Sequence, residues 1–389
     1  MSTPMALRQD GIGLYLHIPF CARRCRFCAF VTRDYRDDRA VAFVTDLLKE
    51  IELAGDAGLV RGRRVGTVYF GGGTPTTLSP QQLLTILDAC RRRVDVAPDA
   101  EITIEANPTG VDGPALRALR DGGITRVSFG AQSFDAAELD AAGTPHRAGD
   151  IARAVRSARE AGLPTVNLDL IYGFPGQTPA RWLANLDAAI ALEPDHLSFY
   201  GLTIEEGTSF HRDMERGRMT LPDGDAMADL YEMGRERLKG AGYVQYEVSN
   251  FARPGHECRH NLGYWTDREW LGLGPGAHSY LDGDRFGNVE ALSEYHRLVE
   301  GGMAPIVERE REKGTPELRV REAVAFGLRT IRGVRLGALR RRYHLDPVAR
   351  VKEPIARLTR AGWLVLDAHA LRPSARGLAM ADELAVALL

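Results

Sequence analysis

The first 200 residues alternate short apolar segments with amphipathic helical patterns, and this alternation limits the folds open to the chain. Six segments have the length and composition of buried strands: 14–18, 65–70, 101–105, 126–129, 166–171 and 196–200. Helical patterns lie between them near 38–54, 79–93, 112–121, 148–162 and 179–192. Repeated strand–helix units predict a parallel sheet or barrel. Six units are too few to close an eight-unit barrel, so we expect an open, partial (β/α)6 barrel.

A polar or glycine-rich cluster accompanies the end of each predicted strand. Three cysteines follow the first strand, and the sequence GGGTP follows the second. Glu105 ends the third strand, Gln132 follows the fourth, and Asp169 lies within the fifth. The carboxyl ends of parallel strands share one rim of such a barrel, where sites gather. The pattern therefore predicts a single site at this rim.

The three cysteines after the first strand predict a metal centre. Cys21, Cys25 and Cys28 have the spacing Cys-x3-Cys-x2-Cys, so three thiolates can reach one compact centre. A [4Fe–4S] cluster usually takes four cysteines, and three would leave one iron open to a substrate-like ligand, as a catalytic zinc keeps one position free. A zinc site with His17 as its fourth ligand is the alternative. No fourth cysteine or second pair follows nearby, which favours the cluster.

The cysteine spacing resembles the signature of radical S-adenosylmethionine (SAM) enzymes. In that family the amino and carboxylate groups of SAM chelate the open iron, and the reduced cluster splits SAM to release a 5′-deoxyadenosyl radical. The flanking sequence HIPFC more narrowly resembles the oxygen-independent coproporphyrinogen III oxidase family and its heme-chaperone branch, HemW. The resemblance implies a partial (β/α)6 radical SAM barrel, in agreement with the strand and helix pattern.

The resemblance also assigns SAM contacts to the strand ends. It implies that GGGTP, with Gly72, Gly73 and Thr74, pairs with the methionyl amino group of SAM, and that Glu105 in IEANP accepts the ribose hydroxyls. The other positions that match SAM contacts of the family are Tyr15, Gln132, Arg147 and Asp169. From residue type alone, the glycines also suit a turn and Glu105 a surface acid.

Residues 256–280 hold a dense group of histidines, aromatic residues and one cysteine. Histidine and cysteine serve as axial ligands of heme iron, and aromatic rings can pack on a porphyrin. From residue types alone, a packed aromatic core is the other interpretation. The sequence HNLGYW resembles the HNxxYW motif associated with heme binding in HemW-like proteins, which implies heme contacts by His260, Tyr264 and Trp265. We expect His260 as the axial ligand, with His256, Cys258 and His278 as rivals.

From residue 316 the chain changes character. Residues 281–315 predict a loop-rich connector, and helical patterns at 316–331, 336–342 and 349–361 precede a small hairpin and a last helix. This order predicts a winged-helix-like module, which would bind DNA if it were basic. The chain as a whole has a net charge of −2, and the family has a cap domain here, so we expect a cap and no nucleic acid. The predicted domains are 1–250, the barrel; 251–315, the heme-motif segment and connector; and 316–389, the cap.

The composition of the chain limits the cellular compartments in which we expect the protein. No apolar run reaches the length of a membrane-spanning helix, and the first residues lack the apolar core of a signal peptide. Three of the five cysteines are clustered, which fits a reducing cytoplasm better than a disulfide framework. Cys90 lies in a helical pattern, and we expect it to be a buried packing residue. Peripheral membrane contact and a homodimer both stay open.

Taken together, the sequence predicts a HemW-type heme chaperone that binds a [4Fe–4S] cluster, SAM and heme and delivers heme to cytochromes or other hemoproteins. The alternative is an oxygen-independent coproporphyrinogen III dehydrogenase. That enzyme continues its cysteine motif with a further Cys-x-Cys step and has a long N-terminal arm. Here Cys28 is followed by Ala29 and Phe30, and 20 residues precede Cys21. Radical methyl transfer or heme degradation is a third, weaker possibility, and cleavage of SAM stays open.

Overall fold

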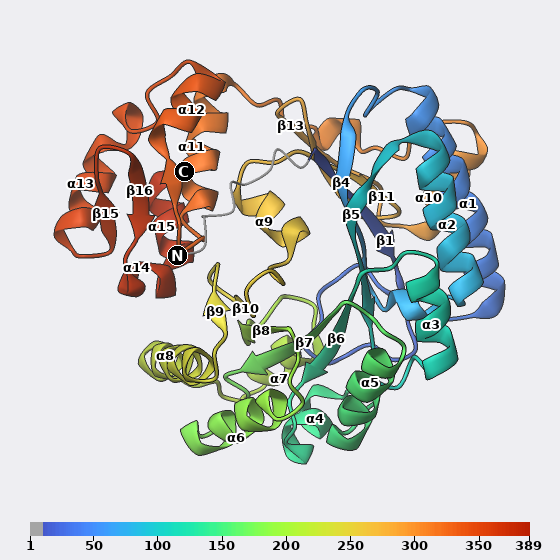
Figure 1. Ribbon diagram of the computed structural model, residues 1–389, viewed down its shortest axis with the longest axis horizontal. Coiled ribbons are helices and arrows are strands. Elements are labelled where there is room, and N and C mark those ends of the chain that lie inside the picture. The colour runs from blue at the N-terminus through green and yellow to red at the C-terminus, as the bar shows by residue number, and fades with distance from the viewer. Residues whose placement is uncertain (1–10) are drawn as a thin grey trace.

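The computed structural model describes residues 11–389, and its main feature is one curved sheet of eleven strands (Figure 1). The strand order is β13-β12-β11-β1-β4-β5-β6-β7-β8-β10-β9. Its six central strands run parallel to one another: β1 (Ile12–Ile18), β4 (Arg64–Gly72), β5 (Asp95–Ala106), β6 (Arg126–Gln132), β7 (Thr165–Tyr172) and β8 (His196–Gly201). Residues 1–10, where the sequence predicts no signal peptide, lie outside the described range.

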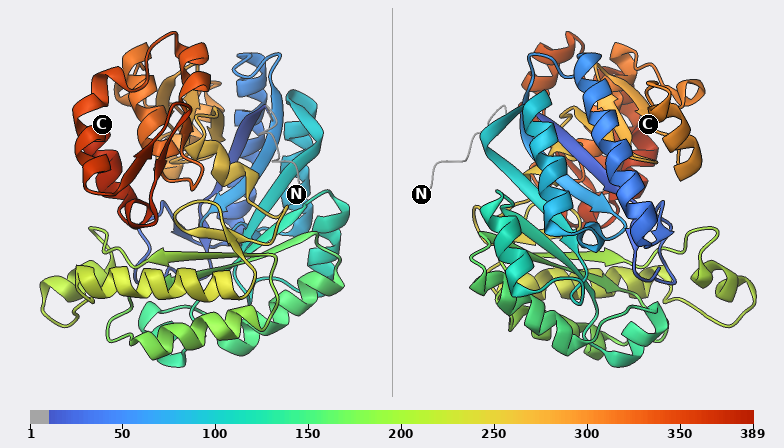
Figure 2. Two further views of the ribbon diagram at one scale, coloured as in Figure 1. Left: turned by 60° about the vertical axis from the view of Figure 1, so that its left-hand side comes forward. Right: turned by 90° about the vertical axis from the view of Figure 1, so that its right-hand side faces the viewer.

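Helices connect these strands and cover the outer face of the sheet (Figures 1 and 2). They are α1 (Asp37–Asp56), α2 (Pro80–Arg93), α3 (Gly113–Asp121), α5 (Ala148–Glu160), α6 (Pro179–Ile190) and α8 (Gly224–Gly240). Two short helices absent from the sequence prediction, α4 (Ala136–Ala142) and α7 (Ser209–Glu215), lie in the loops after β6 and β8. The expected partial (β/α)6 barrel is confirmed.

Local sequence explains these elements. Strand β1 is buried at six of its seven residues, as expected for a parallel strand covered on both faces. Helix α2 begins with a capping box between Ser79 and Gln82 and has Pro80 in its first turn. Cys90 in the same helix is 1% exposed, which confirms it as a buried packing residue.

Short strands extend the sheet at both ends. At one end, β10 (Asn250–Ala252) and β9 (Val244–Gln245) run antiparallel beyond β8. At the other end, β11 (Trp270–Leu273) pairs in parallel with β1 and is followed by the hairpin β12 (His278–Leu281) and β13 (Asp284–Gly287). Between these two ends of the sheet, α9 (Arg259–Trp265) lies inside its curve (Figure 1). The smallest strands, β2 (Phe20–Cys21) and β3 (Arg33–Asp34), bracket the cysteine loop.

The loop-rich connector predicted for 281–315 is wrong in part. The segment contains β13 and the helix α10 (Leu292–Glu300), which packs against α1. Asp282 and Gly283, the two loop residues of the β12–β13 hairpin, both have positive φ angles, 52° and 80°. An Asp-Gly pair favours this tight hairpin turn, so the residue types did indicate the hairpin.

Residues from 316 onward form a separate helical module with a three-stranded sheet. Its helices are α11 (Pro316–Gly327), α12 (Leu336–Tyr343), α13 (Lys352–Arg360), α14 (Ala375–Ala379) and α15 (Ala381–Leu388). Its sheet has the order β14-β16-β15, formed by β14 (Val334–Arg335), β16 (Ala370–Pro373) and β15 (Leu364–Leu366). Helices with a terminal hairpin give the expected winged-helix-like arrangement.

The module bridges the two ends of the curved sheet. Next to β9, the backbone N–H of Val248 donates to the carbonyl of Arg329 at 2.9 Å. On β13, the guanidinium of Arg285 donates to both carboxylate oxygens of Glu322, at 3.3 and 3.2 Å. The module therefore closes the lateral opening of the barrel.

The hydrophobic core of the described residues has two large clusters and a small third one around Phe174 and Phe210. One cluster of buried side chains runs from Ile12 to Val299, and a second lies within the C-terminal module between Ala323 and Leu388. The predicted boundary at residue 250 stays a prediction, although Leu271, Leu273 and Tyr295 belong to the first cluster. In the described part of the chain, no helix combines the length and the apolar character needed to span a membrane.

Candidate functional site

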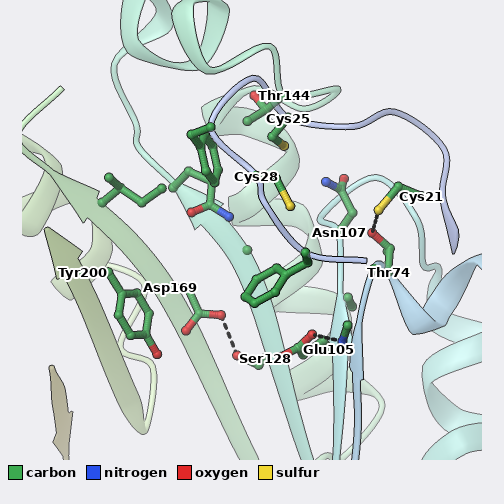
Figure 3. A pocket seen from close by; sticks show the side chains of 18 of the residues that line it. Cys21, Cys25, Cys28, Thr74, Glu105, Asn107, Ser128, Thr144, Asp169 and Tyr200 are labelled. Carbon is green, nitrogen blue, oxygen red and sulfur yellow. Dashed lines mark hydrogen bonds between the residues drawn. The ribbon is translucent and has the colours of Figure 1, made fainter. Parts of the chain in front are cut away.

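A cavity of about 370 Å³ opens at the carboxyl ends of the parallel strands (Figure 3). We call it the strand-end cavity. Its described lining residues all come from the segment 21–203, so the C-terminal module contributes none of them. The predicted site residues among them are Cys21, Cys25, Cys28, Gly72, Gly73, Thr74, Glu105, Gln132 and Asp169. The sequence clusters therefore do meet at one rim.

The cysteine loop is held by contacts on both sides of Arg26. The backbone N–H of Arg26 donates to the carbonyl of Ala142 at 2.9 Å, and its carbonyl accepts from Phe210 at 3.1 Å. The Arg26 side chain pairs with Asp213. These contacts tie the loop to α4 and α7, two of the helices that the sequence did not predict.

The three thiols face the same cavity and are partly buried. Burial raises the pKa of each of them, for Cys25 to about 12. Thr74 donates a hydrogen bond to Cys21 Sγ at 3.7 Å. Three soft sulfur ligands on one cavity wall fit an iron–sulfur cluster, and binding a metal would release their protons.

His17 does not supply the fourth ligand that the zinc alternative needs. Its Nε2 is hydrogen-bonded to the carbonyl of Val31 at 2.8 Å, and its Nδ1 to the hydroxyl of Tyr15 at 3.1 Å. With both ring nitrogens engaged, the imidazole supports the backbone behind the cysteine loop. The geometry thus favours the cluster over zinc.

The glycines of the GGGTP segment are required by the protein's own packing. Gly72 has a φ of +107°, and a Cβ there would lie 2.5 Å from the His17 ring. A Cβ on Gly73 would lie 2.5 Å from the carbonyl oxygen of Phe20. We expected these glycines to make room for a ligand. They line the cavity, but their missing side chains first of all allow β4 to pass close to the cysteine loop.

Glu105 lies at the base of the cavity and is fixed by two donors. Tyr69 donates its hydroxyl to Oε1 at 2.7 Å, and the backbone N–H of Gly72 donates to Oε2 at 3.2 Å. Burial raises the pKa of Glu105 to about 7, although both hydrogen bonds lower it. A carboxylate whose pKa is perturbed in a cavity is a candidate functional group.

Asp169 faces the cavity from β7 within a polar network. Ser128 donates to its Oδ2 at 2.7 Å, and Asn167 donates to its Oδ1 at 2.8 Å. The network continues from Asn167 Oδ1 to His196 Nδ1 at 2.6 Å. Burial raises the pKa of Asp169, and these hydrogen bonds oppose the shift.

Two predicted SAM residues do not line the strand-end cavity. Arg147 caps the start of α5, and its side chain is 54% exposed in an ion pair with Asp140. Tyr15 bonds to His17 and stacks on Tyr69, with ring centroids 6.2 Å apart. Both assignments stay predictions. Gln132 does line the cavity, at a positive φ of 62° beside a register shift in β6.

Asn107 and Tyr200 also line the cavity, from the clusters at the ends of the third and sixth predicted strands, whereas the lining residues Tyr69, Ser128 and His146 were not predicted. One of these, Tyr69, follows from strand alternation. Thr67, Tyr69 and Gly71 alternate along β4, as Glu101, Thr103 and Glu105 do along β5, and side chains two apart point to one face. Placing Glu105 in the cavity therefore also places Tyr69, its neighbour on the adjacent strand.

The HNLGYW motif forms α9 at the opposite end of the barrel interior. The carboxylate of Glu101 accepts the backbone N–H of Arg259 and of His260, each at 3.0 Å. Glu101 is in register with Thr67, well before the ends of β5 and β4. The motif thus lies below the strand-end cavity, as a floor of the barrel.

The predicted heme ligand His260 is 3% exposed and engaged at both ring nitrogens. Nδ1 is hydrogen-bonded to Thr67 Oγ1 at 2.8 Å and Nε2 to the hydroxyl of Tyr264 at 2.9 Å. Burial lowers the pKa of His260 to about 3. Its role as a ligand stays a prediction, and it demands that Nε2 leave Tyr264. Of its rivals, Cys258 is buried and His278 is exposed.

Tyr264 and Trp265 do not form one open aromatic wall. Tyr264 packs edge-on against Trp270, with centroids 4.7 Å apart, whereas Trp265 lies under the guanidinium of Arg329. The space between Tyr264 and the C-terminal module is about 10 Å³, which holds about one water. A large ligand reaches this surface only if the module moves.

Comparisons with known proteins agree with this geometry. The Radical SAM superfamily profile matches residues 15–189, and the HemN C-terminal domain profile matches residues 315–380. The structure of coproporphyrinogen III oxidase (HemN) from Escherichia coli superimposes with a TM-score of 0.83 and 25% identity, over 98% of this chain and 91% of that one. The fold and the cysteine-lined rim thus define a radical SAM protein.

The curated relatives narrow the class. The heme chaperone HemW of Mycobacterium tuberculosis is 41% identical over 85% of each chain, and that of Escherichia coli is 40% identical over 69% of each. The mouse mitochondrial radical S-adenosyl methionine domain-containing protein 1 is 36% identical over 97% of this chain and 87% of its own. The chain belongs to the HemW family of radical SAM proteins.

Proposed function

We propose that this protein is a heme chaperone that carries a [4Fe–4S] cluster and SAM at the strand-end cavity, binds heme, and passes it to hemoprotein acceptors such as cytochromes. The family assignment supports this proposal. The observation that carries it is the convergence of three cysteines and Glu105 on one cavity. Its volume of about 370 Å³ lies within the range of small-molecule sites.

The lining residues fit the cluster and SAM. Cys21, Cys25 and Cys28 would hold the cluster, and Glu105 would accept the ribose hydroxyls, since it is fixed and faces the cavity. When bound and reduced, the cluster would supply one electron to the sulfonium of SAM. The residues at the carboxyl ends of the strands would hold SAM at this end of the barrel. Gly72 and Gly73 line the same cavity, and their backbone would take the methionyl amino group.

The alternative, coproporphyrinogen III dehydrogenation, requires a tetrapyrrole propionate next to SAM inside this cavity. The decisive experiment uses anaerobically reconstituted protein in two parallel assays. In the first, coproporphyrinogen III, SAM and a reductant are supplied, and we expect no protoporphyrinogen. In the second, the protein is loaded with heme and mixed with an apo-cytochrome, and we expect heme transfer visible in the Soret band.

The two assays are expected to give opposite results for a heme chaperone and for a coproporphyrinogen III dehydrogenase. Protoporphyrinogen formed over many turnovers would overturn the chaperone proposal. Heme that neither binds nor leaves for the acceptor would do the same. A control with the cluster removed separates heme binding from cluster chemistry, because the heme site is expected on α9 and its surroundings, away from the cysteines.

A further inference from the structure

His260 is packed against the inner face of β4 at two successive inward positions, Thr67 and Tyr69. Its Nδ1 is bonded to Thr67, and its ring stacks on Tyr69 with centroids 5.0 Å apart and planes 26° apart. A Cβ on Gly13 of the neighbouring β1 would lie 3.2 Å from the same ring. The imidazole is therefore packed closely against the backbone of β1 at this glycine. The imidazole therefore fills the space directly below the Tyr69 ring.

Tyr69 contacts two rings and directs its hydroxyl at Glu105. Tyr15 from β1 and His260 from α9 both stack on it, with planes 25° and 26° apart. These two contacts restrict the plane of the phenol, and the hydroxyl lies 2.7 Å from Glu105 Oε1. The other bond to Glu105, from the Gly72 N–H, is longer, at 3.2 Å. The hydrogen bond from Tyr69 is thus the shorter of the two that orient the carboxylate.

The position of His260 is itself fixed from two sides. Glu101 accepts its backbone N–H at 3.0 Å, and Tyr264 holds Nε2 at 2.9 Å. A neutral imidazole has one donor and one acceptor nitrogen, and two hydroxyl partners can serve either tautomer. The ring is therefore a rigid support rather than a side chain that is free to turn.

We propose that His260 is a positioning residue of the SAM site, acting through Tyr69 on Glu105. The proposal rests on the proposed binding of SAM at Glu105. It gives the histidine of HNLGYW a role in SAM binding that does not depend on heme. Loss of the ring leaves a void under Tyr69, and a phenol that tilts into it withdraws its hydroxyl from Glu105.

The experiment is a double-mutant cycle on the cluster-loaded protein, with SAM affinity measured by anaerobic calorimetry. Tyr69→Phe removes only the hydroxyl and is expected to raise the Kd for SAM about tenfold. His260→Ala is expected to raise it by a similar factor. Because both act through one hydrogen bond, the double variant is expected to be no weaker than Tyr69→Phe alone, whereas independent effects would multiply to about a hundredfold.

Two further variants keep the test decisive. His256→Ala, in the same segment but hydrogen-bonded to Thr165, is the matched control and is expected to keep the wild-type Kd. His260→Phe keeps a ring against Tyr69 and is expected to bind SAM more tightly than His260→Ala. If His260→Ala does not accumulate as folded protein, the cycle is run with His260→Asn in its place, which also removes the ring.

The outcomes separate this inference from the proposed function. If the wild-type protein with its cluster does not bind SAM, the proposed SAM site fails. If it binds SAM and the His260 variants bind equally well, or if the His260 and Tyr69 effects multiply, the positioning role is wrong while the SAM site stands. Heme titration of the same samples reports any effect on heme independently.

Discussion

Replacing Glu105 by glutamine tests the SAM site with the smallest change of shape. The amide keeps one acceptor oxygen for Tyr69 or Gly72 but loses the charge. Hydrogen bonds to a charged group contribute about 1.5–3 kcal/mol, against about 0.5–1.5 kcal/mol for a neutral pair. For two ribose hydroxyls the loss is about 2–3 kcal/mol, so the Kd for SAM is expected to rise about 30- to 150-fold.

The same carboxylate predicts a pH dependence. Burial raises the pKa of Glu105 to about 7 in the SAM-free protein, so the acceptor form is present above pH 7 and is lost as the pH falls. The Kd for SAM is therefore expected to rise by up to about tenfold for each pH unit below 7. In Glu105→Gln this slope is expected to vanish, because the amide does not titrate.

The assay is anaerobic calorimetry on cluster-loaded protein between pH 6 and 8. Glu206→Gln, an exposed carboxylate in the loop after β8, is the control and is expected to match the wild type. Wild-type affinity in Glu105→Gln, or the same pH slope in both proteins, would refute the assignment of the ribose to this residue.

Three further predictions concern the cluster, the heme site and the C-terminal module. Alanine at all three cysteines of the loop is expected to abolish bound iron and sulfide in anaerobically purified protein, and iron retained in that variant would contradict the cluster assignment. His260→Ala is expected to lower heme affinity in a titration followed in the Soret band, and a loss of affinity in His278→Ala instead would place the ligand at this exposed histidine. Asp267→Ala removes the hydrogen bond from Tyr343 at 2.5 Å and the ion pair with Arg342 at 3.1 Å, both residues of the C-terminal module, and it is expected to weaken docking of the module by on the order of 2 kcal/mol. Hydrogen exchange in α12 measures this change, with the exposed Asp346→Ala as a control near zero.

Strand alternation explains how much of the barrel could be predicted. Apolar segments that are buried on both faces are visible in the sequence, and the predicted positions of β1, β7 and β8 differ from the structure by at most two residues at either end. β5 begins at Asp95, six residues earlier than predicted. Its first half, DVAPDA, contains two aspartates and Pro98, and it is paired with β4 across a register shift. Pairing of that kind depends on the neighbouring strand, which local composition does not reveal.

The site residues, too, divide into those that the sequence could place and those that it could not. Residues at strand ends could be placed at one rim because the rule for parallel barrels is geometric. The position of α9 could not be placed, because it depends on Glu101, which lies more than 150 residues earlier and caps the helix from inside the barrel. Nothing in HNLGYW itself tells at which end of the barrel the motif lies. For the same reason His260 looked like a free ligand, whereas it is packed against β4.

The position of α9 gives the two proposed ligand sites a common support. On the side of the helix that faces the strand-end cavity, His260 stacks on Tyr69, and Tyr69 donates its hydroxyl to Glu105. Just beyond its lower end, Asp267 accepts the hydroxyl of Tyr343 from the C-terminal module. A ligand that reaches His260 must displace Tyr264 from Nε2 and make more room than the 10 Å³ present beside it. Binding free energies between two sites are reciprocal. Heme that moves α9 to reach iron-binding side chains must therefore weaken SAM by the same factor by which SAM weakens heme, whereas heme held at the exposed His278 leaves SAM affinity unchanged.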